Sequence, residues 1–444
     1  MSSIQKWLKE NKIIEVECLI PDITGTARGK LVPADNINQE VLRISEGTLL
    51  QDVLGRFCDQ YEEIIDAEDQ DMMLIADPNT LKLVPWASKP TAQIIHDCET
   101  LDGQMHPLSS RNVLRRVLAC YQKMGIKPVV AAEVEFYLID KNTDPDKPLQ
   151  SPVGRSGRPQ FARQPGGISA LNEYQPIVDT LYEFCEAQDL KIETLVHELG
   201  TAQLEINFIH GEALDMADKV FSFKRTMREA AFKHNIYATF MAKPMQNQPG
   251  SSMHLHQSLV DIKSGKNIFC DADGKHSEIF YHYLGGLQKY TPNLISFYAP
   301  NVNSYRRFAK QNSAPVNLHW ALDNRTVGFR VPNATPTATR VENRFAGVDV
   351  NPYLAIAASL ASGLAGVRNK IQPGQAYKGN AGDEEITVAR SLEEGLRGLA
   401  DLPDVADIIG SEFINAYRLV KLEEFEQYNR VITRWEREHL LLNV

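Results

Sequence analysis

Two glutamates on one apolar strand are the first residues of this sequence whose spacing could do chemistry. Glu133 and Glu135 flank Val134 in the run AAEVEFYLI, and alternation along a strand places both carboxylates on the same face. Two like charges in apolar surroundings repel each other and are poorly hydrated, so a cation or hydrogen-bond donors must neutralise them. A solvated outer strand face would account for this pair alone equally well.

Carboxylates and imidazoles recur in strand-like context farther along the chain. Glu205 lies in AQLEINF, with Glu198 seven residues before it, and His254 and His256 share a strand face in SSMHLHQS. Glu342 completes a set of five carboxylates and two imidazoles. Hard oxygen ligands with one or two imidazoles suit Mg²⁺ or Mn²⁺ better than a structural zinc site, so the set predicts a divalent-cation site.

A cluster of arginines follows these acidic residues. Six fall within 39 residues: Arg306, Arg307, Arg325, Arg330, Arg340 and Arg344. Their interleaving with Phe308, Phe329 and Phe345 favours partial burial over a solvated basic face, and a buried guanidinium prefers a bidentate carboxylate or phosphate. Carboxylate-bound cations beside arginines predict phosphoryl transfer, in which both share the charge of the transferring phosphate.

Strands must position these residues, and the pattern provides strands that alternate with helices. Strand-like runs cover 129–139, 202–210, 236–242 and 252–260, and helical runs cover 174–188 and 215–233. The uncharged run 350–367 predicts a buried helix of small residues, and helices are expected at 391–399 and 412–442. The loop 141–168, rich in Pro, Gly and Arg, is the expected mobile or specificity segment.

The first hundred residues have a different character. Strand-like runs at 13–20 and 31–33, joined by the turn PDITGTARGK, predict a small antiparallel β unit. GTARGK lacks the glycine spacing and the following Ser or Thr of a phosphate loop, so it is interpreted as a turn. The change of character near residue 105 predicts two domains, 1–105 and 106–444.

Composition excludes some functional classes. The 444 residues carry 47 Lys and Arg against 57 Asp and Glu, a net charge of -10 that argues against nucleic-acid binding. The first twenty residues hold no apolar signal segment, and no run predicts a membrane span. Six scattered cysteines without metal-binding spacing indicate reduced thiols and a cytoplasmic protein.

Five ordered motifs resemble the glutamine synthetase superfamily. They are AEVEFYL, HELGTAQLEINF, PGSSMHLHQSL, SYRRF followed by SAPVNLHWALDNRTVGFRVP, and RVENRFAGVDVNPYLAIAA. The resemblance is close from about residue 106 to 370 and loose over the N-terminal β unit. Among the branches of the superfamily, the sequence is most similar to the gamma-glutamylpolyamine synthetases of polyamine metabolism.

The resemblance implies an α+β fold: a small N-terminal β-grasp domain and a C-terminal catalytic domain whose curved antiparallel sheet is flanked by helices. ATP would enter one end of the site and glutamate the other. The implied enzyme phosphorylates the γ-carboxylate of glutamate with ATP, and an amine then attacks the γ-glutamyl phosphate. A cytoplasmic homo-oligomer, a double-ring dodecamer with sites between subunits, is also implied.

The resemblance assigns roles to residues of this sequence. One Mg²⁺ or Mn²⁺ would be held by Glu135, Glu198 and Glu205, and another by Glu133, His254 and Glu342. The implied ATP-side residues are Glu193, His256, Ser258, Arg325, Arg330 and Arg340. Glutamate would contact Gly250, Arg307 and Arg344. The implied catalytic residues are Glu135, Arg330, Arg307 and Glu342.

Departures from the family pattern bear on the acceptor. Ser313 stands where glutamine synthetase proper has a glutamate that covers the site and helps to deprotonate ammonium. Pro249 replaces a usual Asn, Ser252 replaces a usual Gly, and Asp52 is a weak match to an aspartate lent to a neighbouring subunit. The sequence therefore predicts a glutamate–amine ligase acting on a polyamine or a related mono- or diamine. Glutamine synthesis from ammonium, a non-catalytic member of the superfamily and a metal-dependent deaminase or hydrolase are the alternatives.

Overall fold

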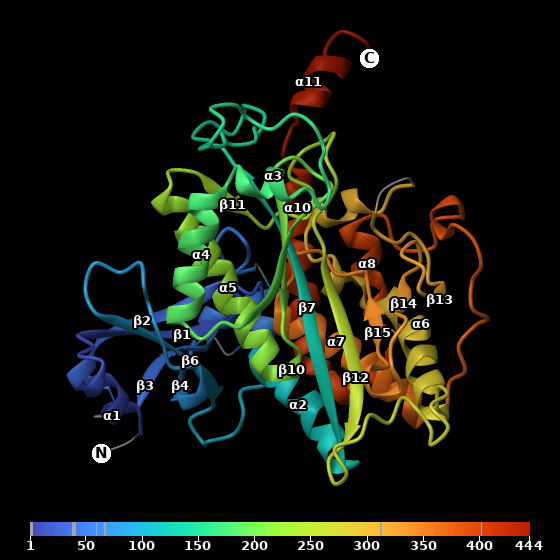
Figure 1. Cartoon of the computed structure of the whole chain (residues 1–444). Helices are drawn as coiled ribbons and strands as arrows, with labels where there is room; N and C mark the ends of the chain where they lie inside the picture. Colours follow the sequence, from blue (N-terminus) through green and yellow to red (C-terminus); the bar gives the residue numbers. More distant parts are fainter. Residues whose placement is uncertain (1–2, 38–40, 59, 66–67, 311–312, 401) are drawn as a thin grey trace.

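The chain combines two β-sheets with helices that cover them. The computed structural model describes residues 3–37, 41–58, 60–65, 68–310, 313–400 and 402–444. The smaller sheet is built from the N-terminal residues, and the larger sheet forms the centre of the molecule, with helices packed on one side of it (Figure 1). The predicted α+β class, with a curved sheet flanked by helices, is confirmed.

The smaller sheet has the strand order β2-β1-β6-β4-β3, with β5 paired to β6. Its strands are β1 (Glu15–Pro21), β2 (Ala27–Pro33), β3 (Leu42–Ser45), β4 (Asp71–Ala76), β5 (Lys82–Leu83) and β6 (Thr91–Glu99). β1 and β2 form the antiparallel hairpin that the sequence predicts. The second strand begins earlier than expected: residues 27–30 of GTARGK pair with β1, so most of this segment is strand and not turn. Gly29 has a positive φ of 149°, and a Cβ there would lie 1.8 Å from the Cys18 carbonyl oxygen, so the hairpin requires glycine at this position.

The larger sheet has the strand order β13-β14-β15-β12-β7-β9-β8, and β10 and β11 pair with β7. Its long members are β7 (Ile126–Ile139) and β12 (Met253–Asp261). The others are β8 (Ile192–His197), β9 (Gln203–Phe208), β10 (Gly211–Glu212), β11 (Tyr237–Thr239), β13 (Trp320–Leu322), β14 (Phe329–Val331) and β15 (Val341–Asn343).

One pair departs from the antiparallel sheet that the family resemblance implies. β13 and β14 run parallel, with Trp320 opposite Phe329. Asp323 leaves β13 with a left-handed φ of 44°, and the Asn324 side chain accepts a hydrogen bond from the Thr326 backbone N–H. This tight loop returns the chain beside the start of β13, so the two short strands point the same way.

The helices on the covered side bury the core. The main ones are α2 (Ser110–Lys123), α4 (Gln175–Ala187), α5 (Ala213–Lys233), α6 (Glu278–Tyr298) and α7 (Pro352–Arg368), with the short α1 (Ser3–Glu10) and α3 (Ile168–Asn172) outside them. α7 confirms the predicted small-residue helix, because its residues from Pro352 to Gly366 are all buried. Gly286 of α6 and Gly366 of α7 let the two backbones touch, since a Cβ on Gly286 would lie 2.6 Å from the Gly366 Cα. None of the helices in the described ranges is long and apolar enough to cross a membrane.

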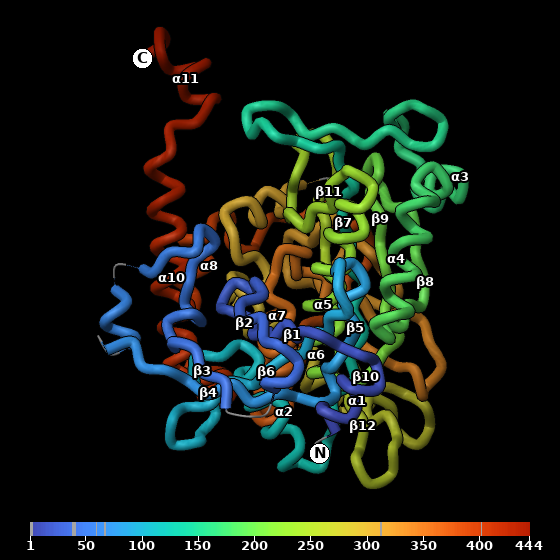
Figure 2. Tube along the Cα trace, turned by 90° about the vertical axis from the view of Figure 1, so that its left-hand side faces the viewer, coloured from blue at the N-terminus to red at the C-terminus, as the bar shows by residue number. Residues whose placement is uncertain are grey.

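The C-terminal helices differ from the prediction. They are α8 (Leu392–Gly398), α9 (Pro403–Ile409), α10 (Ser411–Asn429) and α11 (Arg434–Leu440). The single helix predicted over 412–442 is wrong, because Thr433 starts a new helix with a capping box that pairs its hydroxyl and the Glu436 carboxylate with backbone N–H groups. α10 runs past the smaller sheet, and α11 extends away from the rest of the molecule (Figure 2).

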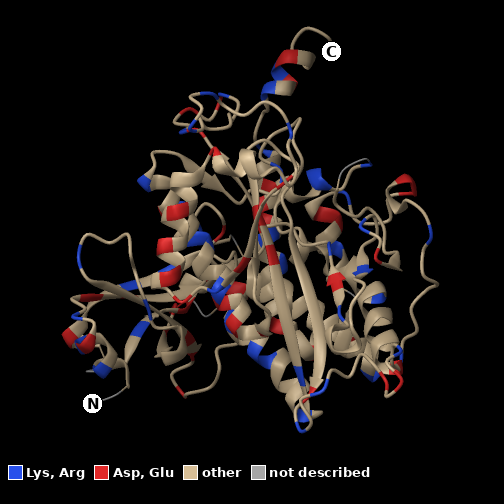
Figure 3. Cartoon of the chain, in the orientation of Figure 1, with Lys and Arg blue, Asp and Glu red and all other residues tan. Residues whose placement is uncertain are grey.

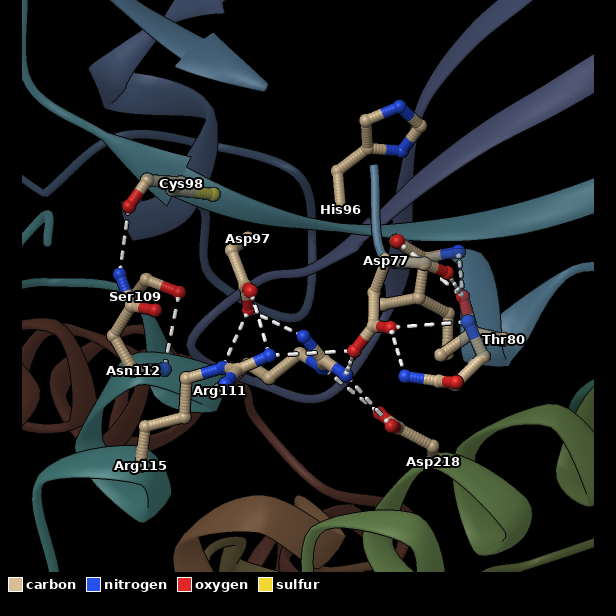
Figure 4. Close-up of polar contacts among 12 residues, drawn as sticks. Asp77, Thr80, His96, Asp97, Cys98, Ser109, Arg111, Asn112, Arg115 and Asp218 are labelled. Atoms are coloured by element: carbon tan, nitrogen blue, oxygen red, sulfur yellow. Dashed lines mark hydrogen bonds and ion pairs between the residues drawn. The ribbon is translucent and has the colours of Figure 1, made fainter. Parts of the chain in front are cut away.

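A buried arginine joins the two sheets. Arg111 of α2 is fully buried and donates two hydrogen bonds to Asp218 of α5, at 3.0 and 2.8 Å. It also binds Asp97 of β6 and, at 2.7 Å, Asp77 beside β4 (Figure 4). Three carboxylates from three elements therefore surround one guanidinium, which holds the smaller sheet against the helices that carry the larger one.

Candidate active site

Strand register brings the sequence-predicted carboxylates and imidazoles together. Glu133 of β7 lies opposite His254 of β12, and Glu135 lies opposite Glu205 of β9. The alternation inferred from AAEVEFYLI thus places Glu133 and Glu135 between two neighbouring strands that carry the other predicted ligands. Acidic residues accordingly mark the middle of the larger sheet (Figure 3).

Glu133 is held between two imidazoles. Its Oε2 lies 3.2 Å from Nδ1 of His254, and its Oε1 lies 2.8 Å from Nε2 of His256. Arg340 donates from Nε to Nδ1 of His256 at 3.1 Å, so Nδ1 is the acceptor nitrogen of this imidazole. The ring proton is therefore on Nε2, which donates a hydrogen bond to Glu133. Burial alone would raise the pKa of Glu133, but these imidazole contacts lower the pKa well below its usual range. Glu133 is therefore an anion.

Glu342 is a second anionic carboxylate close by. It is fully buried; Arg330 donates from Nη1 to its Oε2 at 2.7 Å, and Arg344 donates to its Oε1. Burial opposes ionisation, but Arg344 and the two imidazoles lower the pKa of Glu342 to about 2. His254 Nδ1 lies 3.7 Å from Glu342 Oε1, which links this carboxylate to the Glu133 cluster.

Glu135, Glu198 and Glu205 form a crowded acidic group. Burial and the neighbouring charge of Glu198 raise the pKa of Glu135 to about 8, and burial with three neighbouring glutamates raises the pKa of Glu205 to about 9. The pKa of Glu198 is raised as well, chiefly by burial. Nearby arginines lower the pKa of Glu135 and Glu198 less than burial and mutual repulsion raise it. A divalent cation would supply further positive charge and return these carboxylates to the anionic form.

Two groups of ligand atoms are close enough to hold a cation. Within each group, all atoms lie within 4.8 Å of one another: one group is Glu133, His256 and Glu342, and the other is Glu133, Glu205 and His254. The donors are carboxylate oxygens with one imidazole, which fits Mg²⁺ or Mn²⁺. His256, assigned to the nucleotide from sequence, thus lies with the candidate ligands, and Glu133 belongs to both groups.

A cavity of about 1380 Å³ opens beside Glu133. Four sequence-predicted nucleotide residues line it: Glu193, His256, Ser258 and Arg340. Arg330 instead binds Glu342 and Asp323, and Arg325 is exposed. The cavity is large enough for a nucleotide-sized ligand. Sequence reasoning missed other polar lining residues, such as His210, Lys266 and Asn267. His210 ends a predicted strand, Lys266 and Asn267 follow one, and none of the three forms a motif of its own.

Arg307 is buried beneath the other end of the site. Its Nη1 donates to the Phe345 carbonyl at 3.0 Å, and its Nη2 donates to the Ser252 hydroxyl at 3.0 Å and the Ala346 carbonyl at 3.3 Å. Gly250 packs directly on it, because a Cβ there would lie 2.7 Å from Cγ of Arg307. This guanidinium thus supports the backbone around the site.

The loop 249–252 is fixed to β7. The Ser252 backbone N–H donates to Oε2 of Glu135 at 2.8 Å, and the Tyr137 hydroxyl donates to the Pro249 carbonyl at 2.8 Å. The two residues that depart from the family pattern, Pro249 and Ser252, therefore take part in ordered contacts.

Three residues in loops that the sequence predictions concern are placed by the structure as follows. Gln160, in the predicted specificity loop, accepts a hydrogen bond through Oε1 from the Ala202 N–H at 2.9 Å, and the same oxygen lies 3.0 Å from Nε2 of His197. Ser313 is exposed. The Asp52 carboxylate accepts from the N–H groups of Leu54 and Arg56, both at 2.8 Å, so it organises its own loop.

Comparison with known proteins agrees with the motifs. The sequence profile of the glutamine synthetase catalytic domain matches residues 107–440. Glutamate–isopropylamine ligase of Pseudomonas sp. is 34% identical, over 98% of this chain and 96% of the relative. Gamma-glutamylputrescine synthetase PuuA of Escherichia coli K12 is 31% identical over 96% and 92%. Glutamine synthetase of Pyrococcus abyssi is 32% identical over 95% of each chain. The solved structure of apo GmaS without ligand superposes with a TM-score of 0.85 at 26% identity and covers 100% of both chains.

Proposed function

The chain belongs to the glutamine synthetase family and is a ligase of that type, and we propose that it joins the γ-carboxylate of glutamate to an organic amine with ATP. The buried set of carboxylates, imidazoles and arginines beside a nucleotide-sized cavity is the observation that carries this proposal. The acceptor is a polyamine such as putrescine or spermidine, or a related mono- or diamine.

The reaction has two steps. A γ-carboxylate oxygen of glutamate attacks the terminal phosphorus of ATP and ADP leaves; the amine nitrogen then attacks the acyl carbon, inorganic phosphate leaves and the amine loses a proton. A bound Mg²⁺ or Mn²⁺ would neutralise charge on the transferring phosphate. Arg330 and Glu342 organise the phosphate side, and Glu135 and Arg307 organise the glutamate side.

Ligand contacts are proposed for the remaining residues. Glu193, His256, Ser258 and Arg340 contact the nucleotide from the cavity wall. Arg325, which is exposed and does not line the cavity, is a further proposed contact of the nucleotide. Arg344, with Gly250 and Arg307, receives glutamate. The proposed cation ligands are Glu133, Glu135, Glu198, Glu205, His254 and Glu342.

Two observations support an organic amine as acceptor. Ser313 brings no carboxylate to the acceptor side, which weakens an ammonium site and leaves room for carbon substituents. Two relatives that align over nearly the whole chain are named for isopropylamine and putrescine. Ammonium remains the second candidate, because relatives named glutamine synthetase reach 33% identity.

Phosphate release from ATP tests these acceptors directly. The assay contains Mg²⁺ and glutamate and adds in turn ammonium, isopropylamine, putrescine, spermidine or no amine. We expect release that requires both glutamate and an organic amine, with ammonium a poor acceptor. Ammonium as the best acceptor would establish glutamine synthesis instead, and silence with every amine would contradict the proposal.

We also propose a homo-oligomer in the cytoplasm. Apolar side chains at the end of the chain are exposed, including Ile432 at 63%, Trp435 at 61% and Leu441 at 75%, as expected of a segment that packs on another subunit. Removal of residues 430–444 should lower the mass measured by light scattering; an unchanged mass would exclude this segment from assembly. Among the described residues no cysteine takes part in a disulfide, which suits a reducing compartment, and cell fractionation tests that location.

A further inference from the structure

Gln203 is a buried polar residue at the centre of the candidate site that the reaction scheme does not use. It lies at the start of β9 and is 1% exposed. Its Oε1 accepts from the Gly200 N–H at 2.8 Å. Its Nε2 lies 3.2 Å from Oε2 of Glu135, 3.0 Å from the Gly250 carbonyl oxygen and 3.1 Å from the Ser251 hydroxyl. Two amide hydrogens are thus shared among three acceptors.

The orientation of this amide follows from its neighbours. A reversed side chain would turn Oε1 toward the Gly250 carbonyl, which only accepts hydrogen bonds. It would also turn the NH₂ group of the side-chain amide toward the Gly200 N–H, so that two donors would face each other. Gln203 is therefore fixed with its donors toward the site and its acceptor toward the loop that precedes β9.

The backbone of Gln203 completes a tight loop that carries Glu198. The Glu198 N–H donates to the Gln203 carbonyl at 2.8 Å, and the Gln203 N–H donates to the Gly200 carbonyl at 3.2 Å. Ala202, just before it, has a left-handed φ of 54°, a conformation that a residue with a Cβ adopts only when the surroundings enforce it. The side chain and the backbone of Gln203 both hydrogen-bond to the loop 198–203, and together they fix its conformation.

We propose that Gln203 is a positioning residue that couples the cation ligands to the glutamate-binding loop. It orients Glu135 directly and Glu198 through the loop 198–203, and it holds Gly250 and Ser251 through the same amide nitrogen that contacts Glu135. The link from Gln203 to glutamate binding rests on the proposed function. The link from Gln203 to cation binding depends only on the arrangement of the carboxylates.

Gln203→Met tests the coupling, because methionine keeps the length of the side chain and removes its donors and acceptor. Gln188→Met is the matched control: Gln188 is also 1% exposed and donates to the Leu83 carbonyl at 3.0 Å, but it lies at the end of α4. The first readout is Mn²⁺ binding by electron paramagnetic resonance in the absence of substrates. The second is the KM for glutamate against the KM for ATP.

We expect Gln203→Met to weaken Mn²⁺ binding and to raise the KM for glutamate, each at least tenfold, with the KM for ATP within twofold. Gln188→Met should leave all three values within twofold, even where it lowers thermal stability. Equal effects of the two variants, or unchanged Mn²⁺ binding in Gln203→Met, would overturn the proposal. If the wild type releases phosphate with no amine, the proposed function fails, and the Mn²⁺ comparison still decides the positioning role.

Gln203→Glu provides a second variant should Gln203→Met not fold. It keeps the volume and the acceptor for the Gly200 N–H but removes the donors toward the Gly250 carbonyl and Ser251. We expect at least a tenfold higher KM for glutamate, and a KM within twofold of wild type would refute the link to the glutamate-binding loop.

Discussion

Replacing Arg111 should uncouple the two sheets of this protein. The Arg111→Met variant keeps much of the side-chain volume but removes the positive charge. Among the contacts of the described residues, only this guanidinium pairs with all three carboxylates, Asp77, Asp97 and Asp218. Tyr353 also donates to Asp218 at 2.6 Å, so that this residue keeps one donor.

The expected cost follows from burial. Removing one partner of a buried ion pair leaves uncompensated charge and costs about 3–5 kcal/mol. Arg115, one helical turn later, binds the same Asp97 at 2.7 Å and Asp77 at 3.3 Å, but its side chain is 33% exposed. Water screens such a pair, so Arg115→Met should cost about 0–1 kcal/mol.

The midpoint of thermal unfolding, measured for both variants in the same buffer, compares these two losses of stability. At roughly 2–4 °C per kcal/mol, Arg111→Met should lower the midpoint by roughly 10 °C and Arg115→Met by less than roughly 4 °C. Arg111→Lys, which keeps the charge but not the two-pronged geometry, should fall between them. Equal shifts for Arg111→Met and Arg115→Met would refute the view that burial of this guanidinium joins the sheets.

Three further predictions concern chemistry and pH. Glu342→Gln should reduce phosphate release at least 100-fold while circular dichroism shows a folded protein, since the group that fixes Arg330 and Arg344 loses its charge; full activity would exclude this role. Ser313→Glu should raise the kcat/KM for ammonium relative to bulky amines, and no gain would mean that Ser313 does not exclude ammonium. Burial lowers the pKa of His96 to about 4, so its neutral form contributes stability that is fully present above pH 6.5 and lost as the pH falls toward 4. The loss reaches about 2 kcal/mol by pH 5, measured as the unfolding midpoint against pH, and His96→Gln should lack it.

The types and faces of the site residues could be predicted because strand periodicity is local. Alternation in AAEVEFYLI and SSMHLHQS placed Glu133, Glu135, His254 and His256 on strand faces before any fold was known, and the small-residue composition of 350–367 predicted a buried helix. These inferences need only a few neighbouring residues, and the structure contains β7, β12 and α7 where they were expected.

Contacts between distant segments could not be predicted in this way. The parallel pairing of β13 with β14 depends on a tight loop at Asp323, and the break before α11 depends on a capping box that competes with helix propagation. Arg111 gives no sequence signal either, since its three carboxylate partners come from separate elements. The inward turn of Arg307 is set by the carbonyls of Phe345 and Ala346, which no side-chain pattern reports.

The shared position of Glu133 changes how the two predicted cation positions relate to each other. From sequence they are two independent sets of three ligands. In the fold, Glu133 shares one group of candidate ligand atoms with Glu342 and His256 and another with Glu205 and His254, and the atoms of each group lie within 4.8 Å of one another. Its two oxygens already face different imidazoles, Oε1 toward His256 and Oε2 toward His254. One carboxylate would therefore serve both positions, so the charge at one position would depend on the occupancy of the other. Since Glu135 and Glu205 have raised pKa values in the same acidic group, binding of a cation to that group is expected to release protons from both carboxyls.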